Sequence, residues 1–168
     1  VNHYSTARDL AKLSISMIND FPEHYSLYKE KEFTFDDIRQ LNRNSLLWQD
    51  DSVDGIKTGH TNDSGYCLAG SAIRGETRFV SIVLNSASEK TRIRDTRRLL
   101  DYAFRFYQTK TIVKAYEPLT TVDVWAGIDE KVSLGLGSDL KITLQRNKFK
   151  NLELDLSLIH ISEPTRPS

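Results

Sequence analysis

The chain of 168 residues is long enough for one domain, or for one and a half smaller domains, with a core that folds without cross-links. Hydrophobic residues make up 39% and charged residues 27%, which is typical of a packed globular protein and excludes intrinsic disorder. The 23 basic and 23 acidic side chains balance, so we expect no nucleic-acid partner, and the single cysteine, Cys67, excludes an internal disulfide and a cysteine-rich metal site.

The first predicted element is a helix that begins after Thr6 and ends near Asp20. Thr6 and Asp9 have the spacing of a capping box, in which a hydroxyl and a carboxylate each accept a hydrogen bond from a free backbone amide. The apolar residues that follow recur at helical spacing: Leu10, Leu13 and Met17.

A β-hairpin is predicted next. Phe33 and Phe35 alternate with polar residues, and the alternation indicates a strand. Asp36-Asp37 offers a turn, after which residues 38–42 return as a second strand.

Three antiparallel strands are predicted in the middle of the chain. A strand over residues 55–61 is followed by a turn at 62–65 and by two β-rich runs, 66–74 and 77–84. Gly75-Glu76 between these runs is typical of a two-residue hairpin turn.

A second helix, capped by Ser88, is expected to cover the sheet. Its apolar face carries Ile93, Leu100, Ala103, Phe104 and Tyr107. Arg94, Asp95, Arg98 and Asp101 lie on the face expected to meet water.

After Gln108 the pattern changes to short β-prone segments at 111–116, 120–125, 131–134 and 140–144, which favours a separate all-β module and a domain boundary near residue 108. The last residues, 156–168, resemble a translated frame of a sequencing-library adapter, LSLIHISEPTR, and we expect them to carry no fold or chemistry.

The motif Lys57-Thr58-Gly59 is the strongest candidate for chemistry. Alternation along a strand puts Lys57 and Gly59 on one face and Thr58 and His60 on the other. The ammonium can hold an anionic peptide end, the hydroxyl can donate to a carboxylate, and a glycine lets a substrate backbone lie close to the strand. From the letters alone, a solvated strand lysine beside a turn glycine is the favoured interpretation.

Longer segments resolve this choice. YSTARDLA, YSLYKEKEFTF, IRQLNRN, LLW and VDGIKTGHT, then Gly65-Tyr66, Lys90-Thr91-Arg92 and LLDYAFRFY, closely resemble the low-molecular-weight penicillin-binding proteins of D-alanyl-D-alanine carboxypeptidase type, the peptidase S11 family, over residues 3–155. The resemblance implies an α+β fold in which residues 1–107 form the C-terminal half of a β-lactamase/transpeptidase-like catalytic domain, an antiparallel sheet flanked by helices. Residues 108–155 would begin an all-β domain.

The family uses three motifs, SxxK, SxN and KTG, and this chain carries only the third. The resemblance implies that Lys57 binds and polarises the substrate and that Thr58 and Arg92 hold its terminal carboxylate. Gly59 would line the same site, and the backbone N–H of His60 would form part of the oxyanion hole. Because the nucleophile and base are missing, we expect no catalytic residue in this chain and no activity from it alone.

Two other residues invite a catalytic interpretation. Ser26 and Lys29 satisfy SxxK by letters, but they lie in a run of alternating charges where water would shield a lysine base, so we interpret the match as accidental. His60 lacks a nucleophile elbow and a partner acid at a recognisable spacing, which argues against a triad. Arg43 is open to two interpretations, a cleft residue or half of a structural salt bridge.

The family implies partners and a location. The expected substrate is a peptidoglycan stem peptide ending in D-Ala-D-Ala, β-lactams would acylate the enzyme, and no cofactor or metal is expected. It further implies residence in the periplasm, peripheral on the inner membrane through a C-terminal amphipathic helix that this chain lacks. The alternatives are a class A β-lactamase-like hydrolase, disfavoured by the β-rich extension, and a non-catalytic cell-envelope binding module.

Overall fold

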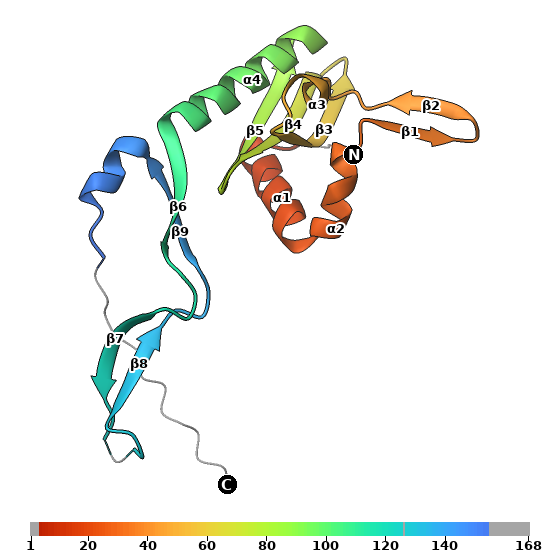
Figure 1. Cartoon of the computed structure of the whole chain (residues 1–168). Helices are drawn as coiled ribbons and strands as arrows, with labels where there is room; N and C mark the ends of the chain where they lie inside the picture. Colours follow the sequence, from red (N-terminus) through yellow and green to blue (C-terminus); the bar gives the residue numbers. More distant parts are fainter. Residues whose placement is uncertain (1–3, 126, 155–168) are drawn as a thin grey trace.

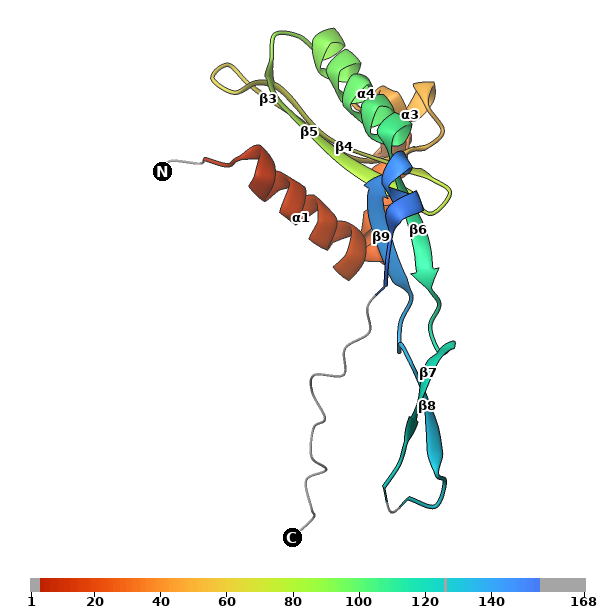
Figure 2. The ribbon, with the colours of Figure 1, turned by 90° about the vertical axis from the view of Figure 1, so that its left-hand side faces the viewer.

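The computed structural model describes residues 4–125 and 127–154, and the predicted adapter-like segment 156–168 lies outside these ranges. Its centre is an antiparallel sheet of β3 (Val53–Thr61), β4 (Gly65–Arg74) and β5 (Thr77–Ser86), in the order β3-β4-β5. The helix α4 (Glu89–Phe106) covers one face of this sheet and α1 (Ala7–Asp20) lies on the other (Figures 1 and 2). This mixture of helices and antiparallel strands is the α+β class predicted from the sequence.

The helix α1 begins at the predicted cap. The Thr6 hydroxyl accepts a hydrogen bond from the Asp9 amide at 3.2 Å and donates one to the Asp9 carboxylate at 2.8 Å. The carboxylate therefore bonds the cap's hydroxyl, where the capping box predicted an amide. Leu13 is 61% exposed, and the covered side of α1 instead carries the buried Ser14 between the half-buried Leu10 and Met17.

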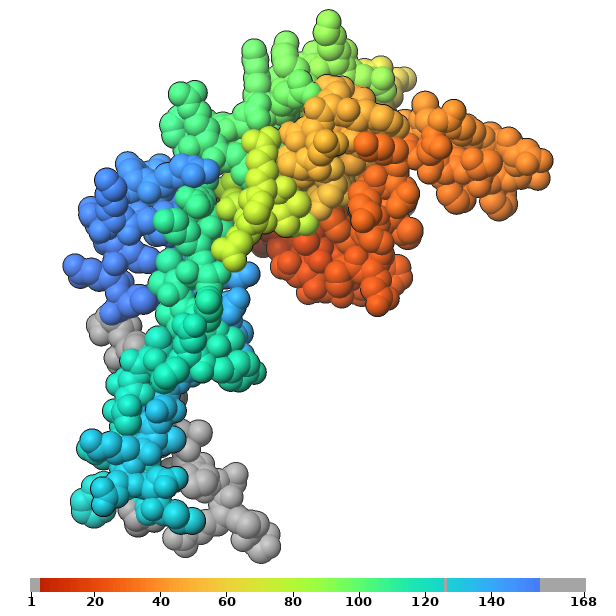
Figure 3. Space-filling view, in the orientation of Figure 1, coloured from red at the N-terminus to blue at the C-terminus, as the bar shows by residue number. Residues whose placement is uncertain are grey.

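The predicted hairpin is confirmed as β1 (Glu32–Phe35) paired with β2 (Ile38–Leu41). Asp36 and Asp37 have φ values of 50° and 58°, the left-handed pair that a tight two-residue hairpin turn needs. The hairpin stands out from the body of the molecule (Figure 3). Before it lie α2 (Pro22–Tyr25) and the 3-10 helix η1 (Ser26–Lys29), and after it comes α3 (Leu46–Gln49), which the sequence did not predict.

The hydrophobic core lies between the sheet and α4, and α3 closes one end of it. Its buried residues are Leu46, Leu47, Val53, Leu68, Ala72, Leu100 and Phe104. The ring of Phe79 packs edge-on against Phe104, with centroids 4.9 Å apart. Each fully buried side chain of this kind contributes about 1.5 to 3 kcal/mol, so this cluster fixes how α4 sits on the strands.

Local signals account for the ends of α4. The Ser88 hydroxyl accepts a hydrogen bond from the Thr91 amide at 3.1 Å, as predicted for the cap. The expectation that Tyr107 belongs to the helix is wrong, because the backbone becomes extended there, with φ −118° and ψ 157°. Tyr107 instead begins β6 (Tyr107–Val113) with no loop between helix and strand.

The rest of the described chain is an extended pair of ribbons. β6 pairs with β9 (Leu140–Gln145), β7 (Pro118–Asp123) pairs with β8 (Lys131–Gly135), and the 3-10 helix η2 (Arg146–Asn151) follows (Figure 1). The predicted β-rich texture is confirmed, although β6 starts four residues before the predicted strand at 111. The domain boundary near residue 108 stays a prediction.

Two features are absent from the described residues. No helix there has the length and apolar character needed to cross a bilayer. Likewise, no group of three or more His, Cys, Asp or Glu side chains within residues 4–125 and 127–154 is arranged to hold a metal ion.

Candidate functional site

The strand β3 presents the Lys57-Thr58-Gly59 motif at the edge of the sheet. Of the strands in the described structure, β3 pairs with β4 alone, with Lys57 opposite Ala69 and Gly59 opposite Cys67. The backbone groups on the other side of an edge strand are available to an added peptide strand. The motif therefore lies where an extended substrate can align with the sheet.

The two faces of β3 differ as the alternation predicted. Thr58 is opposite Leu68, which belongs to the core beneath α4, so Thr58 and His60 share the α4 side. Lys57 and Gly59 then share the opposite face. Lys57 is exposed, and its ammonium donates a hydrogen bond to the carbonyl oxygen of Thr58 at 2.9 Å. The cation is thus free of any acidic partner among the described residues.

Arg92 reaches the motif from the first turn of α4. Its side chain is 2% exposed, with Nη1 3.5 Å from the carbonyl oxygen of Gly59 and Nη2 3.5 Å from a carboxylate oxygen of Glu89. Its Nε atom is buried and has no hydrogen-bond partner among the residues that the structure describes. Because both contacts are at the long limit for hydrogen bonds, this buried cation keeps unused capacity to bind an anion.

An aromatic pair completes this side of the strand. The rings of His60 and Tyr66 lie 4.0 Å apart between centroids, and the Arg92 guanidinium carbon is 5.6 Å from the centre of the Tyr66 ring. The structure therefore brings Arg92, Gly59 and His60 together. Lys57 belongs to the same strand but to its other face.

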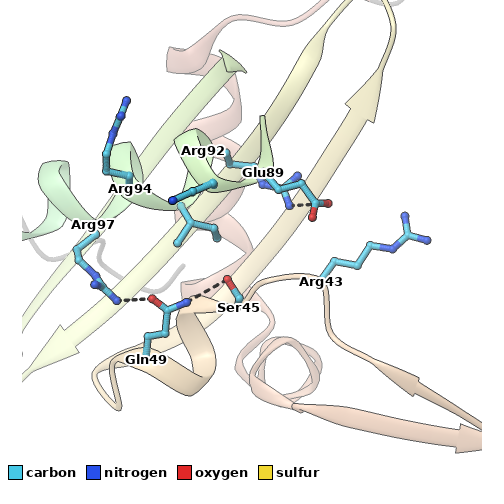
Figure 4. Close-up of a pocket in the computed structure, with 9 residues that line it drawn as sticks. Arg43, Ser45, Gln49, Glu89, Arg92, Arg94 and Arg97 are labelled. Carbon is cyan, nitrogen blue, oxygen red and sulfur yellow. Dashed lines mark hydrogen bonds and ion pairs between the residues drawn. The ribbon is translucent and has the colours of Figure 1, made fainter. Parts of the chain in front are cut away.

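A pocket of about 480 Å³ opens beside Arg92 (Figure 4). Most of its charged lining is basic, with a single carboxylate: Arg43, Ser45, Gln49, Glu89, Lys90, Arg92, Ile93, Arg94 and Arg97. Sequence reasoning did not find Gln49 or Arg97, which reach the pocket from α3 and α4 and bond each other at 2.6 Å. Neither residue belongs to a recognisable motif, so no local signal was available.

Arg43 lines this pocket and joins none of the ion pairs formed within the described residues. This favours the cleft interpretation of Arg43 over the salt-bridge interpretation. In Figure 4 its side chain extends from the loop that leads to α3.

Ser26 lies in a different place. It begins η1, is exposed, and donates a hydrogen bond from its hydroxyl to the carbonyl oxygen of Glu23 at 2.6 Å. Lys29 lines a separate pocket on the side of Asp51 and Asp54. The non-catalytic interpretation of Ser26 stays a prediction that this geometry supports.

Family models match most of the chain. The model described as D-alanyl-D-alanine carboxypeptidase matches residues 1–88, which include the motif on β3, and the model described as penicillin-binding protein 5, C-terminal domain, matches residues 107–164.

Individual relatives agree with the family models. The chain is 44% identical over 151 residues to D-alanyl-D-alanine carboxypeptidase DacA of Escherichia coli, covering 89% of this chain and 38% of that protein. It is 44% identical over 156 residues to DacC of the same organism, covering 92% and 39%. The chain thus spans well under half the length of these curated relatives.

Solved structures share the fold. Penicillin-binding protein 5 of Haemophilus influenzae superposes with a TM-score of 0.78 at 38% identity, covering 89% of this chain and 44% of that one. Penicillin-binding protein D2 of Listeria monocytogenes, solved with cefotaxime bound, gives a TM-score of 0.56 at 37% identity, covering 60% and 41%.

Proposed function

The chain belongs to the peptidase S11 family of D-alanyl-D-alanine carboxypeptidases, and we propose that it is part of a serine carboxypeptidase that removes the last D-alanine from peptidoglycan stem peptides. In this proposal the chain forms the part of the enzyme that binds the terminal end of the substrate. The observation that carries this proposal is the approach of the buried Arg92 to the Lys57-Thr58-Gly59 strand, next to a basic pocket. Residues 1–107 would belong to the catalytic domain and residues 108–155 to the β-rich domain after it.

Each residue of the site has a distinct task. The substrate lies antiparallel along the free edge of β3, and Gly59 presents no side chain to it. The space over Gly59 is open, since among the described residues a Cβ there would meet only the Cβ of Cys67, at 3.8 Å. Thr58 donates its hydroxyl to the terminal carboxylate, and Arg92 supplies the compensating positive charge. The His60 amide contributes one oxyanion-hole donor.

The reaction needs a serine from outside this chain. Its hydroxyl oxygen attacks the carbonyl carbon of the penultimate D-alanine, and a lysine base takes the hydroxyl proton. The base passes this proton to the amide nitrogen as the C–N bond breaks, so the terminal D-alanine leaves with a free amino group. Water then hydrolyses the acyl-enzyme ester. Lys57, whose ammonium has no acidic partner in the described structure, polarises the reacting carbonyl region from the opposite face of β3.

β-Lactams would enter the same site, because their carboxylate and strained amide present the same groups as the terminus of the peptide. The relative from Listeria monocytogenes has been solved with cefotaxime and with ampicillin bound, which supports this proposal.

The family membership disfavours both the β-lactamase-like alternative and the non-catalytic binding module. The site of action would be the periplasm, with peripheral attachment to the inner membrane.

A chimera tests the proposal. This chain replaces the matching 38% of Escherichia coli DacA, and covalent labelling by a fluorescent penicillin is followed on gels. We expect the chain alone to stay unlabelled, the chimera to be labelled, and Lys57→Ala to slow labelling of the chimera by about a hundredfold.

Ser26→Ala in the same chimera is the control, and it should leave the rate unchanged. A folded chimera that takes up no label would overturn the proposed function. Labelling of Ser26 in the chain alone would instead make the chain a complete enzyme with another nucleophile.

A further inference from the structure

A cluster of polar side chains anchors the beginning of β3, just before the motif. The pairing of β3 with β4 shifts between Val53 and Gly55, so Asp54 is the extra residue of a β-bulge. A bulged residue leaves the regular ladder and turns its side chain in a new direction. Here the Asp54 carboxylate accepts hydrogen bonds from the Tyr25 hydroxyl at 2.8 Å and from Arg78 Nη1 at 2.9 Å.

Arg78 connects this carboxylate to the rest of the sheet. Its Nη1 atom also donates to the hydroxyl of Ser71 at 2.7 Å, and its guanidinium carbon lies 5.4 Å from the centre of the Tyr25 ring. Ser71 is fully buried on β4, opposite Gly55. The cluster therefore links α2 to all three strands.

Gly55 is held from two sides. Tyr25 lies so close that a Cβ on Gly55 would come within 2.8 Å of its hydroxyl oxygen and 3.3 Å of its ring carbon Cζ. The side-chain amide of Asn44, which is 1% exposed, donates a hydrogen bond to the Gly55 carbonyl oxygen at 3.0 Å. Neither contact belongs to the sheet, so both add to the pairing with β4.

An edge strand needs such contacts more than an inner strand does. Within the described parts of the chain, β3 pairs with β4 only, and the Lys57 ammonium bonds only the carbonyl of its neighbour Thr58. The pairing with β4 holds one side of the strand, so contacts at its beginning add to what fixes the position of its free edge. A displacement of about 1 Å at a reacting group can cost a hundredfold in rate.

We propose that Tyr25, Asp54 and Arg78 are positioning residues that fix the place of Lys57 and Thr58 relative to the rest of the domain. None of them touches the substrate; they act through Gly55, with Asn44 as the second contact. This inference rests on the proposed function, because the positioning matters only if β3 binds the substrate.

Backbone hydrogen exchange of the full chain tests the anchoring without any catalysis. Tyr25→Phe removes the hydroxyl that bonds Asp54 and keeps the ring. We expect amides 55–61 to exchange about tenfold faster, while the amides of Leu68 and Ala72 in the core exchange at their former rates. Arg39→Met is the matched control, since Arg39 pairs with Glu32 on the exposed hairpin, away from Gly55.

The two possible failures give different patterns. If the exchange rates rise equally in β3, β4 and α4, Tyr25 stabilises the whole fold and not β3 in particular. If the exchange rates in β3 do not change, Tyr25 does not hold this strand in place. Either result overturns the inference.

A pair of substitutions provides a second, independent readout. Gly55→Ala should displace β3 because of the approach of the Tyr25 hydroxyl, and Tyr25→Phe should partly rescue it by removing that oxygen. Exchange in the double variant that equals the product of the two single effects would count against the proposed contact.

The chimera with Escherichia coli DacA then separates this inference from the proposed function. If the parent chimera is labelled by penicillin, Tyr25→Phe should slow labelling about tenfold under conditions where urea unfolding shows both chimeras to be fully folded. An unchanged labelling rate would sink the positioning role. A parent chimera that is never labelled would sink the proposed function, and the exchange experiment alone would then decide the anchor.

Discussion

Arg92, in the first turn of α4, places its Nη1 atom 3.5 Å from the carbonyl oxygen of Gly59 in β3. The residues are 33 positions apart in the chain, and the packing of α4 on the sheet brings them together. A buried guanidinium with long contacts and an unpaired Nε atom is poorly compensated in the free protein. Such a group is typical of a site that trades stability for binding.

Arg92→Met should therefore separate stability from binding. Replacing a poorly compensated buried charge by an apolar side chain of similar length should leave the free energy of unfolding unchanged or raise it by about 1 kcal/mol. Penicillin labelling of the DacA chimera should slow, because the anionic end of the ligand loses its cation. Urea denaturation and labelling kinetics measure the two effects, with Arg98→Met, at an exposed position of the same helix outside the basic pocket, as the control. A large loss of stability would show that Arg92 is mainly structural.

Two glycines in the sheet differ in the space available to an added Cβ. At Gly70 a Cβ would come within 2.8 Å of the Thr96 methyl carbon and 3.1 Å of the Ser81 hydroxyl, so Gly70→Ala should cost about 1 to 3 kcal/mol of stability. At Gly59 the nearest described atom that an added Cβ would meet is the Cβ of Cys67, 3.8 Å away, so Gly59→Ala should fold normally. Its added methyl group should nevertheless hinder a substrate lying on β3 and slow labelling of the chimera. Normal labelling by Gly59→Ala would show that the substrate backbone lies elsewhere.

How much of this site the sequence predicts depends on the distance between its parts. The strand carrying Lys57 and the hairpin turn at Gly75 follow from neighbouring residues, and Gly75 has the φ of +59° that its turn requires. The short helix α3 has only four residues, too few to show a helical period. The burial of Arg92 depends on tertiary packing. So does the meeting of Tyr25 with Arg78, 53 positions along the chain.

The late ionisation of the Tyr25 phenol should be detectable in alkaline solution. Burial raises the pKa of this phenol to about 12 from the ordinary 10.0, and the hydrogen bond to Asp54 acts in the same direction. Below pH 10 the phenol is neutral in both folded and unfolded chains. Between these two pKa values the unfolded chain loses the proton first, so the free energy of unfolding should fall by up to roughly 3 kcal/mol as pH rises.

Absorbance of tyrosinate against pH provides the measurement, with Tyr25→Phe as the reference that lacks the late-titrating group. Urea midpoints over the same range should decline less in that variant. If Tyr25→Phe instead removes a phenol that titrates near the ordinary tyrosine pKa of 10.0, that result would contradict the burial of the Tyr25 hydroxyl.

Asp50 should contribute to stability in the opposite pH range. Burial raises the pKa of its carboxyl, but hydrogen bonds from Ser52 and the guanidinium of Arg74 at 3.0 Å outweigh that effect and hold the pKa below the ordinary 3.8. Its stabilising contribution is therefore complete above that value and is lost as pH falls through the lower folded pKa. In Asp50→Asn, the free energy of unfolding measured with urea should depend less on pH in the acid range. Asp129→Asn, an exposed aspartate, should leave the curve as it was.

The direct passage of α4 into β6 affects how the chain can be cut. Phe106 ends the helix and Tyr107 starts the strand, and two residues later the Thr109 amide is bonded at 2.9 Å to the buried hydroxyl of Thr77. A protease needs several residues of accessible backbone that is free of hydrogen bonds, and here the Tyr107 amide bonds the Ala103 carbonyl while residues 107–111 pair with β9. Limited digestion should therefore cleave elsewhere first. The segments matched by the two family models, 1–88 and 107–164, should separate into two fragments only after the sheet has unfolded.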